Sequence, residues 1–311
     1  MEKPLISVII CTYNRAGMLR GCVESLIQQT LPGDLYEVII VDNNSDDETN
    51  DMAQRYASSH QNIRLVHEQA QGLSHARNRG WKEARGKYIA YIDDDARAAP
   101  EWCAFIVHAF ETVNPQPAAV GGEILPLYDS PPPPWFSDDF ERHTWGNDKG
   151  FLRLSGAKMG FSGSNMTLRR DLFEKFGGFS TSLGMAGGKI GVAEESEFFA
   201  RVYEHEPLFW YDPAIQVFHH VPLKNMSIVY RLTRAFKSGQ TIARIDRKNF
   251  QQAERQKVAK RCLLLAAEIP YRFLLDKQTC RMVNFAKRLN FFTYLLGYLF
   301  SAERANFWHD A

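Results

Sequence analysis

The amino-acid sequence predicts an α/β protein: a mostly parallel sheet flanked by helices, followed by a helical extension at the C-terminal end. Two observations carry this prediction. Apolar, β-branched runs alternate with helical patterns over residues 1–117, and such alternation with short links is typical of parallel, doubly wound sheets. Beyond Ser227 the apolar spacing is helical. The 311 residues suffice for one large core, or for one core with an appendage.

Four apolar runs are the expected strands of the first half. LISVIIC and YEVIIVD, at residues 5–11 and 36–42, are continuous and rich in β-branched side chains. IRLVHE and KYIAYID, at 63–68 and 87–93, are weaker versions of the same pattern. Since ligands of open α/β sheets bind beyond the carboxyl ends of the strands, we expect the functional side chains at that edge.

Three helical patterns lie among these strands. Apolar side chains at i, i+3 and i+4 spacing over residues 18–27 predict the first helix, with Asn14 as its N-cap. Ser74 would cap a second helix over residues 75–84. Pro100 suits the first turn of a third. The predicted apolar face of that third helix is Phe105, Ile106, Ala109, Phe110 and Val113.

The second half is less regular. The expected elements are a strand at 118–125, a long polar and aromatic loop at 129–150, a small-residue turn and short helix at 161–179, a Gly-rich loop running into a helix at 184–205, and an extended stretch at 208–222. We therefore expect a catalytic domain over residues 1–223, with a nucleotide-binding half (1–117) and an acceptor half (118–223). Residues 224–311 would form a helical, basic C-terminal region.

Composition narrows the class of protein. The formal net charge is +1, yet residues 224–311 hold about 17 Lys and Arg against about 6 Asp and Glu, so a basic tail follows an acidic body. Five cysteines without a C-x-x-C pair predict reduced thiols in a cytoplasmic protein. The first strand begins too early for a signal peptide, and no apolar run reaches the roughly 20 residues of a membrane span.

Polar side chains gather where the first, second and fourth strands end. They are Thr12, Asn14, Arg15, Asp42, Asn43, Asp93, Asp94 and Asp95. The Asp triplet allows three interpretations: a solvated turn, a charge cluster at a helix N-terminus, or a site for hard Mg²⁺ or Mn²⁺ that leaves coordination positions for phosphate. Its position at the sheet edge favours the metal.

Other polar residues can be explained by a structural or solvent-exposed position as well as by a functional role. Arg77 and Asn78 could lie on a solvated helix face, as could the acidic side chains at 194, 195 and 197. His219 and His220 follow an apolar run, where a histidine is more often structural than a ligand. Taken alone, none of these residues identifies a site.

In combination, the motifs resemble those of the family 2 glycosyltransferases, which have the GT-A fold. The resemblance covers roughly residues 5–240 and keeps the family's order and spacing. It rests on SVIICTYNR, VDNNSDDET, GLSHARNRG with ARGKYIAYIDDD, FSGSNMTLRR with FGGF, EESEFFAR, and HHVP.

The resemblance implies a role for each matching residue. Asp42 would hydrogen-bond the base, expected to be uracil, and Arg77 would help to hold the nucleotide. Asp93 would lie near the ribose, as the first residue of the family's D-x-D motif. The full set implied for the nucleotide site is Thr12, Tyr13, Asn14, Arg15, Asp42, Arg77, Asp93 and Asp94.

The resemblance also implies a metal site and a base. Asp95 and His219 would ligate Mn²⁺ or Mg²⁺, with His220 as an adjacent rival. Glu195 would be the general base, although the family usually writes GEDxEL where this chain has AEESEF, so a Glu stands in place of an Asp. The Gly-rich segment 184–191 would be a lid over the donor.

The expected activity is therefore transfer of a sugar, with inversion, from a nucleotide sugar, most simply a UDP-sugar, to a glycan or lipid-linked acceptor in cell-surface polysaccharide or glycoconjugate synthesis. Two alternatives remain at this stage. A nucleotidyltransferase would need a basic Gly-rich loop after the first strand, and CTYNRAGM is not one. A non-catalytic binding protein with a degenerate site is the second alternative. All the polar positions expected of the site are filled in this sequence, which argues against it. Aromatic side chains that could either stack on acceptor sugars or belong to the core are Trp135, Phe136, Trp145 and Phe161.

The basic tail, residues 224–311, has three interpretations. It could be a helical subdomain with Lys and Arg on its solvated face. It could make a peripheral contact at the inner face of the membrane, beside a lipid-linked acceptor. It could also mediate oligomerisation. No nucleic-acid-binding motif accompanies its charge, so we expect no nucleic-acid partner.

Overall fold

The computed structural model describes residues 3–154, 160–182, 194–245, 252–278 and 282–303. The chain divides into two compact units. The first contains residues up to Leu127 and from Arg142 to His220, and the second contains Tyr128–Glu141 and the residues from Val221 onward. The segment 128–141 thus groups with the C-terminal helices although it lies within the first unit's sequence.

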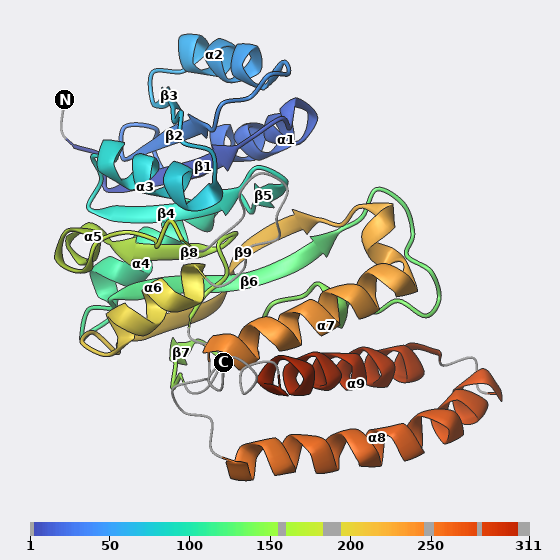
Figure 1. Cartoon of the computed structure of the whole chain (residues 1–311). Coiled ribbons are helices and arrows are strands. Elements are labelled where there is room, and N and C mark those ends of the chain that lie inside the picture. The colour runs from blue at the N-terminus through green and yellow to red at the C-terminus, as the bar shows by residue number, and fades with distance from the viewer. Residues whose placement is uncertain (1–2, 155–159, 183–193, 246–251, 279–281, 304–311) are drawn as a thin grey trace, which may run out of the picture. The chain divides into compact units, whose positions relative to one another are not determined.

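One sheet of nine strands organises the described part of the first unit (Figure 1). The strands are β1 (Ile6–Thr12), β2 (Tyr36–Asp42), β3 (Ile63–His67), β4 (Tyr88–Asp93), β5 (Ala96–Ala98), β6 (Ala119–Leu127), β7 (Gly150–Phe151), β8 (Met166–Arg169) and β9 (Phe209–His220). Their order is β3-β2-β1-β4-β8-β6-β9-β5, with β7 paired to β9. The first four strands are mutually parallel, whereas β8 runs antiparallel to both of its neighbours. The expected α/β class is confirmed, with a mixed rather than uniformly parallel sheet.

Helices cover both faces of this sheet. They are α1 (Ala16–Ile27), α2 (Thr49–Ser59), α3 (Leu73–Glu83), α4 (Trp102–Thr112), α5 (Arg170–Phe176) and α6 (Glu194–Tyr203). Alternate side chains of a strand point to opposite faces. Ile6, Val8 and Ile10 accordingly pack with α1, α2 and α4, and Ile9 packs with α3, α5 and α6. Burial on both faces explains why the first strands read as unbroken apolar runs.

Several local predictions were wrong. Asn14 does not cap α1: Arg15 is the N-cap residue, and Asn14 has a positive φ of 52°. The second of the predicted helices is α3, which begins at Leu73. Its N-cap is Gly72, so Ser74 lies inside the helix and does not cap it. Pro100 precedes α4, whose N-cap is Glu101, and Phe105 is exposed rather than on the buried face.

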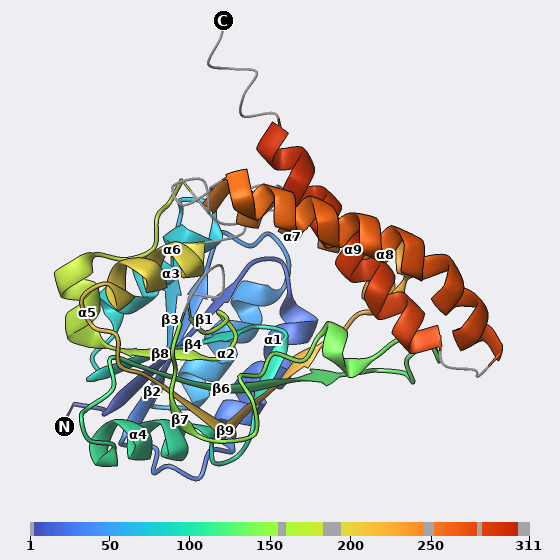
Figure 2. The same ribbon diagram turned by 90° about the horizontal axis from the view of Figure 1, so that it is seen from below.

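The second unit is helical. It contains the short 3₁₀ helices η1 (Asp138–Phe140) and η2 (Leu223–Met226), followed by α7 (Ile228–Ile245), α8 (Gln252–Gln278) and α9 (Met282–Glu303). Helices α7 and α9 lie side by side (Figures 1 and 2). Two glycines permit this close approach, since a Cβ at Gly239 would lie 2.0 Å from the Tyr294 carbonyl oxygen and one at Gly297 would lie 2.0 Å from that of Phe236. None of the described helices is long and apolar enough to cross a membrane.

Segment 128–141 is tied into the second unit by a buried arginine. Arg231, at the start of α7, forms an ion pair with Glu141 and donates hydrogen bonds to the backbone oxygens of Phe140 and Asn225. Its guanidinium also lies 5.3 Å from the centre of the Phe136 ring. Both charged partners are buried, so each compensates the other's loss of hydration.

Candidate functional site

The carboxyl ends of three parallel strands meet at one edge of the sheet. Thr12 at the end of β1 is in register with Asp42 of β2, and Cys11 is in register with Asp93 of β4. The polar residues that follow these strands are therefore neighbours, as their positions in the sequence predict.

Asp93, Asp95 and His219 form one cluster, in which a ligand atom from each residue lies within 4.8 Å of the others. The Nε2 atom of His219 is 3.2 Å from an Asp95 carboxylate oxygen and 3.7 Å from one of Asp93. Strand pairing creates this arrangement: Ala96 of β5 is in register with His219 of β9, and the His220 backbone N–H donates to the Asp95 carbonyl oxygen. Because side chains alternate along a strand, His219 faces the carboxylates and His220 points to the opposite side.

The charges of this cluster suit a divalent cation. Burial by itself lowers the pKa of His219, but its hydrogen bonds and charge interactions with Asp93 and Asp95 outweigh burial and raise that pKa to about 10. Burial would raise the pKa of Asp93, yet His219, Arg77 and Ser164 hold it below its usual range. Two ionised carboxylates and one imidazole within a few ångströms are a ligand set that Mn²⁺ or Mg²⁺ accepts. A cation here would take the place of the imidazolium proton.

Asp94 has a different environment from its two neighbours. It is buried, and its carboxylate oxygens accept hydrogen bonds from the Thr12 hydroxyl (2.8 Å) and the Arg15 guanidinium (3.0 Å). Arg15 also pairs with Asp95 at 2.8 Å. Burial is the main cause that raises the pKa of Asp94 to about 7, and the Asp95 and Asp93 charges add to it. Arg15 therefore offsets the repulsion within the Asp triplet.

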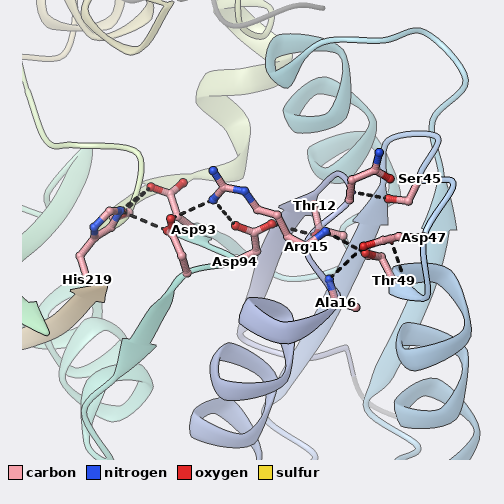
Figure 3. Close-up of polar contacts among 12 residues, drawn as sticks. Thr12, Arg15, Ala16, Ser45, Asp47, Thr49, Asp93, Asp94 and His219 are labelled. Carbon is pink, nitrogen blue, oxygen red and sulfur yellow. Dashed lines mark hydrogen bonds and ion pairs between the residues drawn. The ribbon is translucent and has the colours of Figure 1, made fainter. Parts of the chain in front are cut away.

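The links that follow β1 and β2 are bound to each other. Figure 3 shows the polar contacts of this sheet edge in one row, from His219 at one end to Ser45, Asp47 and Thr49 at the other. The Asn14 backbone N–H donates to the Ser45 hydroxyl (3.0 Å), and the Arg15 backbone N–H donates to the Thr49 hydroxyl (2.9 Å).

Two further residues implied for the nucleotide site border these links. Asp42 is buried and accepts from the Ser45 backbone N–H (3.2 Å) and the Asn50 amide (3.3 Å). Tyr13 is 46% exposed, so its ring is open to a ligand. Asp42 thus ends β2, and Tyr13 follows β1 at the same edge of the sheet.

Arg77 connects the cluster of Asp93, Asp95 and His219 to α6. It is buried in α3, and its guanidinium lies 2.9 Å from Glu194, 3.0 Å from Glu195 and 3.9 Å from Asp93. Burial by itself would lower the pKa of Arg77, but these three carboxylates raise it. Its side chain is therefore a fixed positive charge that orients the start of α6 relative to β4.

The two glutamates at the start of α6 differ in accessibility. The Glu194 side chain is 4% exposed, and burial, followed by the Glu195 charge, raises its pKa. The Glu195 side chain is 25% exposed. The Glu195 carboxylate is therefore accessible from solvent, whereas that of Glu194 is not.

Segment 161–165 supplies contacts that sequence reasoning did not assign. The Ser164 hydroxyl donates a hydrogen bond to Asp93. A Cβ at Gly163 would lie 2.1 Å from Arg77 and 2.5 Å from Glu195, so only glycine leaves room for this ion pair. The Asn165 amide binds the Glu123 and Ile215 carbonyl oxygens and accepts from the Trp102 indole. The sequence signal was present in FSGSN, where small and polar residues precede a strand.

Other expected residues lie apart from this cluster or outside the described residues. The Gly-rich segment 184–191 belongs to the part of the chain that the structure does not describe. Phe161 is buried against Phe199 and Phe209, so it belongs to the core. Phe136 is likewise buried, and Trp135 and Trp145 are partly buried against apolar clusters.

The chain resembles known proteins in both sequence and structure. The model of the family "Glycosyl transferase family 2" matches residues 7–177, more than half of the chain. The glucosyl-dolichyl phosphate glucuronosyltransferase of Haloferax volcanii is 30% identical over 201 residues, which are 64% of this chain and 63% of that protein. The putative glycosyltransferase EpsH of Bacillus subtilis is 40% identical over 103 residues, 33% of this chain and 29% of that one. The chain thus spans less than two thirds of the length of these curated relatives.

Among solved structures, the mannosyltransferase PcManGT of Pyrobaculum calidifontis, in complex with GDP-Man and Mn²⁺, aligns with the whole of this chain and 89% of its own, with a TM-score of 0.64 and 20% identity. At that identity the likeness shows a common fold.

Proposed function

This chain belongs to glycosyl transferase family 2, and we propose that it transfers a sugar from a nucleoside-diphosphate sugar to an acceptor hydroxyl, with inversion at the anomeric carbon. The observation that carries the proposal is the cluster of Asp93, Asp95 and His219, connected through Arg77 to the accessible carboxylate of Glu195. Such a displacement requires a cation site and a base. Here the buried Arg77 contacts Asp93 of the first and Glu195, the second.

Asp93, Asp95 and His219 would hold Mn²⁺ or Mg²⁺. When bound, the cation supplies positive charge against the diphosphate of the donor, which becomes more negative as it leaves. The protein supports this site in two ways. Ser164 and Arg77 orient Asp93, and Arg15 orients Asp95, so the carboxylates are positioned before a ligand arrives.

Glu195 would be the general base. It accepts the proton of the acceptor hydroxyl while that oxygen bonds to the anomeric carbon and the bond from this carbon to the diphosphate oxygen breaks. Because the attack comes from the side opposite the leaving group, the configuration inverts. Glu194 is buried against Arg77. It shares the charge of that arginine, so Arg77 does not pair with Glu195 alone.

The nucleotide would lie over the ends of β1 and β2. Asp42 and Tyr13 would offer a hydrogen-bonding carboxylate and an open ring for the base, and Thr12, Asn14 and Arg15 would line the nucleotide pocket beside them. We propose uracil as the base, on the resemblance of VDNNS to the family's motif. The complex of PcManGT holds GDP-Man, so the test below includes both bases.

The proposed acceptor is a glycan or a lipid-linked sugar in cell-surface polysaccharide or glycoconjugate synthesis. The name of the Haloferax volcanii relative, a glucosyl-dolichyl phosphate glucuronosyltransferase, supports an acceptor carried on a lipid. The proposed place of the reaction is the cytoplasm, at the inner face of the membrane.

The test is a donor screen with product analysis. Wild-type protein, Mn²⁺ and a panel of UDP- and GDP-sugars should give slow release of free nucleoside diphosphate with one donor class, and Asp95→Asn should abolish it. His220→Ala, which changes the neighbouring histidine on the other face of β9, should retain most of the activity. Release of pyrophosphate in place of nucleoside diphosphate would identify a nucleotidyltransferase. Full activity of Asp95→Asn would contradict the assigned metal site.

A further inference from the structure

Helix α8 is apolar on two opposite sides. On its inner side, Cys262 and Leu265 are buried with Leu295 of α9. On its outer side, Leu263 is 73% exposed, Leu264 60%, Tyr271 63% and Leu274 62%. A helix that is apolar all round is usually covered on all sides. Here α9 covers one side, and the other carries large apolar side chains in the open.

The outer apolar residues share one stripe. Leu264 and Tyr271 are seven residues apart and Leu263 and Leu274 are eleven apart, and both separations bring side chains back to the same side of an α-helix. The smaller Ala267 lies between them and is exposed as well. From Leu263 to Leu274 the stripe extends about 16 Å along the axis. We call Leu263, Leu264, Ala267, Tyr271 and Leu274 the α8 face.

Basic side chains border the α8 face at both ends. Lys260 and Arg261 are exposed before it, and Lys277 is exposed after it. Of the two acidic residues of the same stretch, Glu268 is partly exposed and pairs with Arg272 and Arg288, and Asp276 is buried. Among the described side chains of α8, residues 256–277, no acidic one is exposed. The surface is therefore apolar in the middle, and the exposed charged side chains of this stretch are cationic.

We propose that the α8 face lies on an anionic lipid surface, with its leucines and Tyr271 among the acyl chains near the headgroups and Lys260, Arg261 and Lys277 against lipid phosphates. An apolar stripe bordered by Lys and Arg has the charge and polarity that an interfacial helix needs. Lying on the membrane, rather than crossing it, agrees with the absence of a spanning helix among the described residues. The proposal deepens the proposed function, since its benefit, access to a lipid-linked acceptor, rests on that function.

Charge favours lipid over a second copy of the chain. In a symmetric dimer the same face meets itself, so the basic border of one copy would approach the basic border of the other. Like charges at an interface oppose association, whereas anionic headgroups neutralise the same residues. The α8 face thus matches a negatively charged apolar interface better than it matches itself.

The experiment is co-sedimentation of the full chain with vesicles. One set is phosphatidylcholine alone, and the other is phosphatidylcholine mixed with phosphatidylglycerol. We expect binding to the anionic vesicles only, weakened when salt rises from about 0.05 M to about 0.5 M. Replacing both lysines, Lys260→Gln with Lys277→Gln, should weaken binding roughly 30-fold, at about fivefold for each lysine. The variant Leu263→Ser/Leu264→Ser/Leu274→Ser should weaken it by more than roughly 100-fold.

Matched controls lie in the first unit. Arg55→Gln removes an exposed charge from α2, and Phe105→Ser removes an exposed apolar ring from α4; both should bind like the wild type. Equal binding to neutral vesicles, or wild-type binding by the leucine variant, would overturn the proposal. So would an absence of vesicle binding together with a dimer, seen by analytical ultracentrifugation, that the leucine variant dissociates.

Release of nucleoside diphosphate is measured on the same samples. The α8 variants should keep it, because their substitutions lie outside the proposed catalytic machinery. Vesicle binding without donor turnover would refute the proposed function alone, and donor turnover without vesicle binding would refute the lipid contact alone.

Discussion

Glu194 and Glu195 are adjacent in the sequence, yet their surroundings give them different tasks. Both pair with Arg77, but the side chain of Glu194 is almost fully enclosed and that of Glu195 is a quarter exposed. A group that must receive a proton from an acceptor has to be reachable, and a group that only balances the charge of a buried arginine does not. The exposure of the two side chains therefore favours Glu195 over Glu194 as the proposed base.

This difference gives a prediction for the base. Glu195→Gln keeps the size and polarity of the side chain but cannot take up a proton, so the transfer rate should fall by roughly 10²–10⁴-fold. Donor affinity, measured by calorimetry, should change little, because the lost interaction acts in the transition state. Glu194→Gln is the matched control and should cost less transfer activity. The reverse order of the two losses would show that the assignment within AEESEF is wrong by one residue.

At the proposed cation site, His219 should make metal binding depend on pH. In the metal-free protein its pKa is about 10, above the ordinary 6.5, because Asp93 and Asp95 outweigh the effect of burial. The stabilising contribution of its protonated ring is complete below pH 6.5 and is lost as pH rises through about 10. A cation must displace that proton, so Mn²⁺ affinity should rise between these values, by up to about tenfold for each pH unit.

Calorimetry in buffers of different ionisation enthalpy measures this effect, since Mn²⁺ binding to the wild type at pH 7 should release close to one proton. His219→Ala should bind Mn²⁺ weakly, without this proton release and with a flatter pH profile. Unchanged proton release in the variant would mean that another group carries the proton.

At the scale of elements, the segment that precedes β8 contacts residues of both the proposed base site and the proposed cation site. Ser164 bonds to Asp93 at the end of β4, and Gly163 lies against both Arg77 of α3 and Glu195 of α6. One short segment thus touches α3 and β4, which are neighbours in the sequence, and α6, which follows much later in the chain. The geometry between β4 and α6 depends on how closely its backbone can approach.

Gly163→Ala tests this dependence. The added methyl group would overlap Arg77 and Glu195, which must move apart, and a displacement of that size at a reacting group should reduce transfer by about tenfold or more. Gly150→Ala in β7 is the control, because nothing lies within 4 Å of its added Cβ, and it should leave activity and stability nearly unchanged. Steady-state kinetics and thermal melting distinguish the two, and equal kinetics would remove the positioning role from Gly163.

At the scale of the whole molecule, the second unit is built from two stretches of chain that are about 80 residues apart. Segment 128–141 joins it through Glu141, which accepts ion pairs from Arg231 and Arg234. Arg231 is buried, and the side chain of Arg234 is 43% exposed. The two arginines thus make the same kind of contact at different depths.

Removing each arginine should have unequal effects. Arg231→Met leaves the buried Glu141 without its main partner and should lower the free energy of unfolding by about 3–5 kcal/mol, with faster proteolytic cleavage in 128–141. Arg234→Met removes a solvent-screened pair and should cost at most about 1 kcal/mol. Urea denaturation and limited proteolysis of the full chain provide both readouts. Similar losses for the two variants would contradict the role of burial.

Much of the fold and of the site could be predicted from the sequence because the information is local. Unbroken β-branched runs specify strands buried on both faces, and the β2 run was predicted to the residue. The polar residues that end β1, β2 and β4 had to share one edge once those strands were parallel and adjacent. The helical spacing beyond Ser227 likewise predicted α7, α8 and α9.

Only the tertiary structure decided how distant parts combine. The choice between His219 and His220 depends on the register of β9 against β5, because a shift of one residue would exchange their faces. The short strand β8 lies between β4 and β6 and runs antiparallel to both, which its own residues do not encode. Arg77 acquires its three carboxylate partners from α6 and β4, more than a hundred and about sixteen residues away. Such pairings are set by packing between elements. Side chains that are chemically alike in the sequence differ in accessibility and charge environment once only some of them are buried away from water.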